Sequence, residues 1–82
     1  MKLYLVNLKD RRWEDCLYDA FDAHVVAAPS PYRARVLVSN AAADEGRAVW
    51  LDASKSTVTE IGVPKIEFGS EPRIILSSFN AG

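Results

Sequence analysis

The sequence predicts a small α+β domain in which four strands and one helix follow the order β-β-α-β-β. Four segments are rich in β-branched and aromatic residues, and they cover residues 2–8, 20–28, 56–62 and 73–80. One segment between the two pairs, residues 31–43, carries apolar residues at helical spacing. The economical arrangement is a mostly antiparallel four-stranded sheet with the helix packed on one face.

The composition indicates a single folded domain over residues 1–82. The 82 residues are 49% hydrophobic and 26% charged, a balance typical of a folded chain rather than a disordered one. A formal net charge of −1 lacks the basic excess of proteins that bind phosphate backbones. The single cysteine, Cys16, excludes an internal disulfide and a cysteine-based zinc cluster within one chain.

The first two predicted strands are joined by a connection that is long for a hairpin. Residues 2–8 (KLYLVNL) and 20–28 (AFDAHVVAA) are dense in β-forming side chains, and the strongest β signal is the Val25-Val26 pair. The connector between them, residues 9–19, is longer than the loop of about two to five residues that is usual in hairpins. Long loops of this kind commonly carry binding residues.

Helix signals begin at Ser30 and Pro31. Serine can accept hydrogen bonds from the free N–H groups of the first turn, and proline suits the first helical position. Four apolar residues then recur at helical spacing, namely Ala34, Leu37, Val38 and Ala41. The segment Asp44-Glu45-Gly46 supplies a stop, since glycine can adopt the left-handed conformation after the last turn. A helix over residues 31–43 follows.

The second half of the chain contains two further strands. Residues 47–55 (RAVWLDASK) allow two interpretations, a short edge strand or a packed loop that closes the core. Residues 56–62 (STVTEIG) alternate and are β-branched, so we expect the third strand there. Residues 63–72 contain two prolines and one glycine and form a second long connector. Residues 73–80 (RIILSSFN) form the last strand, and the order of the strands in the sheet does not follow from these patterns.

The junction between the second strand and the helix, residues 25–37, has the layout of a phosphate site. Its sequence AAPSPYRA nevertheless contains no glycine to let the backbone approach a ligand, and Pro31 removes one of the amides. Arg33 and Arg35 diverge by about 200° around the helix axis, so the helix alone cannot form a clamp from them. We interpret the stretch as a helix cap followed by solvated arginines.

No catalytic constellation stands out, and we expect a protein without enzymatic activity, cofactor or bound metal. Asp22 could orient the only histidine, His24, as a general base. We interpret His24 instead as a half-exposed histidine of a strand. Ser77 and Ser78 lack the glycine-flanked elbow of a nucleophilic serine. A loose acidic run lacks the ligand spacing of a calcium loop and is interpreted as solvated; it consists of Glu14, Asp15, Asp19 and Asp22.

The connector 9–19 mixes positive charge with an aromatic ring. Arg11, Arg12 and Trp13 could contact a single-stranded nucleic acid by charge and stacking. Acidic residues in the same segment neutralise the charge, and no strand carries the aromatic-glycine pattern of an RNA-recognition sheet. We therefore do not favour nucleic acid as the partner and keep it as a weak alternative.

Large aromatic side chains in the connectors point to a protein-binding surface. Four of them lie outside the regular elements, namely Trp13, Tyr18, Trp50 and Phe68. Some must complete the small core, but aromatic residues and arginine also dominate protein interfaces. The predicted partner-binding residues are Arg11, Arg12, Trp13, Tyr18 and Phe68. The alternative is a structural component that self-associates through an exposed strand edge.

Two segments resemble a group of uncharacterised small proteins encoded by bacteriophages and prophages. YDAFDAHVVAAPS (18–30) is similar to their YD-x-x-D-x-x-VVAA-x-S stretch, and IILSSFNAG (74–82) is similar to their terminal VI-x-ASFNAG. A looser similarity at KLYL and at TVTEIG (57–62) extends the resemblance over most of the chain. Residues 40–55 differ from the longer, tryptophan-rich insertion of that group.

The resemblance implies a phage-type accessory protein in the cytoplasm of a bacterial host. Such a protein is expected to bind and block or modulate a host or defence-system protein, as anti-CRISPR inhibitors do. The start of the chain, MKLYLVNLKD, is too short for a signal-peptide core or a membrane span, which agrees with that expected location.

Overall fold

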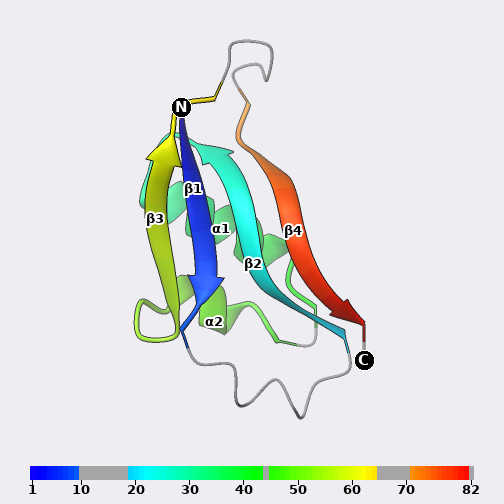
Figure 1. The fold of residues 1–82 in the computed structure, drawn as a ribbon. Helices are drawn as coiled ribbons and strands as arrows, with labels where there is room; N and C mark the ends of the chain where they lie inside the picture. Colours follow the sequence, from blue (N-terminus) through cyan, green and yellow to red (C-terminus); the bar gives the residue numbers. More distant parts are fainter. Residues whose placement is uncertain (10–18, 44, 65–70, 82) are drawn as a thin grey trace.

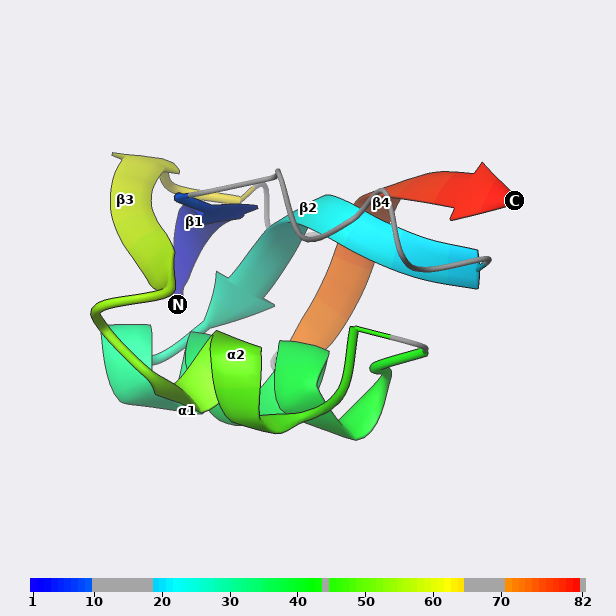
Figure 2. The ribbon, with the colours of Figure 1, turned by 90° about the horizontal axis from the view of Figure 1, so that it is seen from below.

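The computed structural model describes residues 1–9, 19–43, 45–64 and 71–81. Its elements are β1 (Lys2–Leu8), β2 (Asp19–Ala28), α1 (Pro31–Asn40), α2 (Ala48–Leu51), β3 (Ser56–Gly62) and β4 (Arg73–Ala81). The strands form one antiparallel sheet in the order β3-β1-β2-β4 (Figure 1). Figure 2 shows α1 and α2 together in a layer on one face of this sheet. The predicted α+β class and the antiparallel four-stranded sheet are confirmed.

The start of α1 follows the predicted local chemistry. Ser30 has extended backbone angles, and its hydroxyl accepts a hydrogen bond from the backbone N–H of Arg33 at 3.2 Å. Pro31 occupies the first turn, where its missing N–H costs nothing. This end of the helix is therefore determined by two neighbouring residues.

The end of α1 differs from the predicted boundary, because the helix stops at Asn40 rather than at residue 43. The N–H of Ala43 donates to the Glu45 side chain at 3.1 Å, so it is not available to a helical carbonyl. The expected left-handed glycine is present at Gly46, with φ of 82°, but it follows this turn instead of capping α1. A local hydrogen bond within this turn therefore overrides the helix propensity of the alanines.

Residues 47–55 contain α2, a helix of four residues that neither interpretation of this segment included. Its Trp50 is fully buried, so the segment does close one end of the core. The buried core lies between the sheet and the helices and consists of Tyr4, Val6, Leu8, Val26, Ala28, Ala34, Val38 and Trp50. The opposite face of the sheet lies outside this layer (Figure 2).

Candidate functional site

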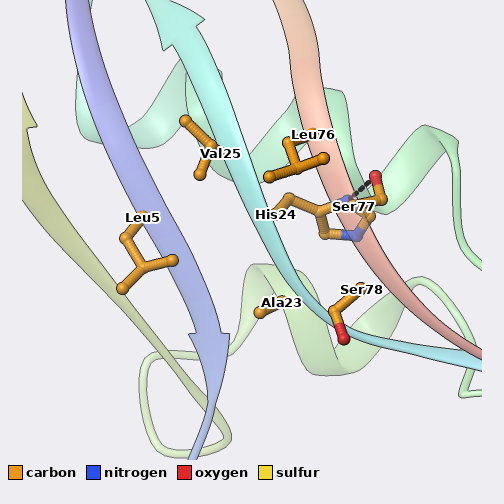
Figure 3. A pocket seen from close by; sticks show the side chains of 7 residues that line it. All are labelled: Leu5, Ala23, His24, Val25, Leu76, Ser77 and Ser78. Atoms are coloured by element: carbon orange, nitrogen blue, oxygen red, sulfur yellow. Dashed lines mark hydrogen bonds between the residues drawn. The ribbon is translucent and has the colours of Figure 1, made fainter.

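The sheet face opposite the helices carries an open cavity with a volume of about 350 Å³. Its lining residues come from three neighbouring strands and are Leu5, Ala23, His24, Val25, Leu76, Ser77 and Ser78 (Figure 3). The lining is mainly apolar, which favours contact with another apolar surface over the binding of an ion.

The pairing register places three apolar side chains in one row across this face. Leu5 is directly opposite Val25, and Val25 is directly opposite Leu76. Directly opposed residues share a face of the sheet, so the three side chains lie side by side (Figure 3). Leu5 and Val25 are half-buried, whereas Leu76 on the edge strand is 67% exposed. We call these three residues the apolar row.

A β-bulge brings Leu76 into the apolar row. Val25 pairs with Leu76 but the next residue, Val26, pairs with Ile74, so Ile75 is an extra residue on β4. In a regular strand, residues two apart lie on the same face. The extra residue instead lets Ile74 pack against the core while Leu76 lies on the open face.

A second group of polar residues lies on the helix side of the sheet, around the carboxylate of Glu45. Glu45 Oε1 accepts hydrogen bonds from the backbone N–H groups of Phe21 at 3.0 Å and Ala43 at 3.1 Å. Glu45 Oε2 accepts one from the indole N–H of Trp50 at 2.7 Å. The Glu45 side chain is only 6% exposed, so these three donors compensate for the burial of its charge.

His24 lies beside this carboxylate and is 1% exposed, so the interpretation as a half-exposed strand histidine is wrong. Its ring packs at 4.9 Å from the ring of Phe21 and edge-on at 5.0 Å from that of Trp50. Burial lowers the pKa of His24, and the negative charges of Glu45 and Asp22 oppose this effect only in part.

His24 and Ser77 form a pair that sequence spacing did not reveal. The two residues are directly opposite each other on β2 and β4, and His24 Nδ1 and Ser77 Oγ are 2.7 Å apart. A histidine that activates a serine is normally held by a carboxylate on its second ring nitrogen. Among the residues that the structure describes, His24 Nε2 has no hydrogen-bond partner, and both oxygens of Glu45 are engaged elsewhere. This geometry fits a structural pair better than a nucleophile.

Arg35 also differs from its expected role as a solvated side chain. Its guanidinium donates to Trp50 O at 3.0 Å, to Ser56 Oγ at 2.7 Å and to Ser56 O at 3.0 Å, and so connects α1, α2 and β3. Arg33 is exposed, as expected. The two arginines therefore do not form an anion clamp. This agrees with the prediction that they diverge around the helix axis.

The predicted partner-binding residues lie outside the part of the chain that the structure describes; they are Arg11, Arg12, Trp13, Tyr18 and Phe68. The fourth connector aromatic, Trp50, belongs to the core. The apolar row was missed because Leu76 reaches the open face only through the bulge at Ile75.

No protein-family model, curated protein or solved structure matches this chain. Within the described ranges, none of the helices has the length and apolar character needed to cross a membrane.

Proposed function

We propose that the protein is a non-enzymatic binding protein that docks another protein on the open face of its sheet. The observation that carries this proposal is the apolar row, with Leu76 left 67% exposed at its outer end. Full burial of a leucine side chain contributes about 1.5–3 kcal/mol, so covering this row is a source of binding free energy.

The surroundings of the apolar row are suited to a protein partner. Thr59 continues the row on β3, opposite Leu5, and Ser78 lies opposite Ala23 in the neighbouring row. An apolar centre with hydroxyl groups at its margin is the usual anatomy of a protein interface. Arg73 lies opposite Ala27 at one corner of this face. A single positive charge gives little electrostatic attraction for the phosphate backbone of a nucleic acid.

The family resemblance supports a setting for this activity. Similarity to phage-encoded proteins favours a bacterial host or defence-system protein as the partner, bound in the host cytoplasm. In that setting, occupation of the partner's surface blocks or modulates its function without chemistry. An anti-defence inhibitor of the anti-CRISPR kind works in this way.

Self-association through a strand edge is the alternative. β4 is an edge strand of nine residues, with Ile75 36% and Leu76 67% exposed. The bulge at Ile75 interrupts the regular row of edge N–H and C=O groups, and such bulges commonly protect edges from pairing. We therefore favour the open face over the edge.

A matched pair of leucine variants tests the proposed face. Leu76→Lys places a charge in the apolar row, whereas Leu51→Lys makes the same change at a leucine that is 44% exposed on α2, in the other layer. The immobilised wild type and Leu51→Lys should retain the same protein from host lysate. Leu76→Lys should bind the purified partner about 10–100-fold more weakly by calorimetry.

Two results would change this proposal. Equal retention by Leu76→Lys and the wild type would exclude the open face as the docking surface. If the double variant Arg12→Ala/Trp13→Ala alone lost the partner while remaining folded, the connector predicted from the sequence would be the binding surface. Light scattering at high concentration tests the alternative, because self-association through β4 requires a dimer or larger species.

A further inference from the structure

His24 is an ionisable side chain in a place that suits only its neutral form. The ring is 1% exposed, lies between two aromatic rings, and has one hydrogen bond, to Ser77. Its second nitrogen, Nε2, is buried and has no hydrogen-bond partner among the described residues. Protonation would place a second N–H donor and a positive charge at this position.

The contacts around His24 hold the segment that contains α2 against the sheet. The last pair between β1 and β2 is Asn7 with Ala23, so the N–H of Phe21 lies beyond β1 and donates to Glu45 instead. Glu45 in turn accepts from the indole of Trp50, which packs on His24. Two hydrogen bonds, from Phe21 to Glu45 and from Trp50 to Glu45, therefore connect β2 to α2 beside the imidazole ring.

We propose that His24 is a pH-sensitive latch whose protonation weakens the contact between Trp50 and Glu45. A buried cationic Nε2–H must gain an acceptor or water, because an uncompensated buried charge is costly. Glu45 Oε2 already accepts from the indole N–H, so an Nε2–H that donates to the same oxygen competes with that contact. Trp50 also packs against the ring, so water that enters from the side of α2 displaces the indole. Both routes weaken the same hydrogen bond.

The charged groups near the ring determine the direction of the switch. Asp22 on β2 and Glu45 before α2 are the two carboxylates that act on His24. β4 contributes the uncharged Ser77, α2 contributes the uncharged Trp50, and Arg35 of α1 is directed to Ser56 and the Trp50 carbonyl. Burial outweighs the two carboxylates and lowers the pKa of His24, so the latch is closed at neutral pH and opens in acid.

The chain offers a direct test because it contains one histidine and two tryptophans. Trp13→Phe leaves Trp50 as the only indole. NMR titration from about pH 8 to about pH 4.5 then follows the His24 ring and the Trp50 indole N–H in one sample. We expect a His24 midpoint below about 6.5, the value of an unperturbed histidine. The indole resonance should shift, and its solvent exchange should accelerate, with the same midpoint.

A control variant separates the latch from general acid unfolding. His24→Gln in the Trp13→Phe background keeps a polar side chain but cannot titrate, so the indole resonance should stay unchanged through the His24 midpoint. An indole that does not respond while His24 titrates would overturn the proposal. The same indole transition in His24→Gln would also overturn it. Neither measurement requires a partner, so the latch is tested independently of the proposed binding function.

Discussion

The indole N–H of Trp50 donates to the Glu45 carboxylate at 2.7 Å inside the core, where Trp50 is fully buried and Glu45 is 6% exposed. The same carboxylate accepts from the backbone N–H groups of Phe21 and Ala43. One side chain therefore ends α1 early, fixes the turn before α2 and connects that turn to β2. Glu45 therefore belongs to the predicted helix stop and also makes two contacts that the sequence does not predict, with Phe21 and Trp50.

The first prediction concerns Glu45→Gln. The amide nitrogen of glutamine cannot accept a hydrogen bond, so at least one of the three N–H donors loses its acceptor. An unsatisfied buried donor costs about 1–3 kcal/mol, which should appear as a lower free energy of unfolding in urea. Glu60→Gln is the control, because its exposed ion pair with Lys2 is worth at most about 1 kcal/mol. Equal losses in the two variants would contradict the assigned role of Glu45.

The second prediction compares the two arginines of α1. Arg35→Ala removes three hydrogen bonds that connect α1 to Trp50 and Ser56 and should lower the free energy of unfolding by about 1.5–3 kcal/mol. Arg33→Ala changes an exposed side chain on the same helix and should stay within about 0.5 kcal/mol of the wild type. Urea titration of both variants measures the difference. A small loss for Arg35→Ala would show that the bridge contributes little.

How far the sequence predicts the fold depends on the range of the determining contacts. The start of α1 was predicted because Ser30 and Pro31 act on the turn that they precede. The burial of His24 was not predicted, because the ring is covered by Trp50, which lies 26 residues further along the chain. The position of Leu76 was missed for a related reason, since a bulge depends on the pairing of two strands. Local signals thus predicted the elements, and pairing between distant segments determined the site.

The third prediction is the dependence of stability on pH. The pKa of His24 is lower in the folded protein than in the unfolded chain, where it is about 6.5. The unfolded state therefore binds more protons as the pH falls below about 6.5, and the free energy of unfolding decreases until the pH reaches the folded pKa. Above about 6.5, His24 contributes no slope. Urea midpoints at about pH 7.5, 6.5 and 5.5 measure this change.

A variant isolates the contribution of the imidazole to this pH dependence. His24→Gln should have a flatter profile between about pH 6.5 and 5.5 than the wild type, because no other histidine is present. Carboxylates account for any further loss at lower pH. If the two profiles were parallel in this interval, the burial of His24 would not be the cause of the acid sensitivity.

The last prediction tests the bulge that divides Ile74 from Leu76. Ile74 packs against the core while Leu76 is 67% exposed on the other face, although both are apolar residues of one edge strand. Ile74→Ala should cost about 2 kcal/mol, near the low end for a core isoleucine because the side chain is half-buried. Leu76→Ala should change the free energy of unfolding by less than about 0.5 kcal/mol.

Deletion of Ile75 provides a sharper version of the same test. Removal of the extra residue makes Ile74 and Leu76 neighbours in a regular strand, so they lie on opposite faces without a bulge. The pairs Val25 with Leu76 and Val26 with Ile74 are then retained, and both side chains keep their faces. The deletion should therefore cost less stability than Ile74→Ala, and so should Ile75→Ala. A deletion that cost more than Ile74→Ala would mean that β4 has another register, and the apolar row would then lose its outermost member.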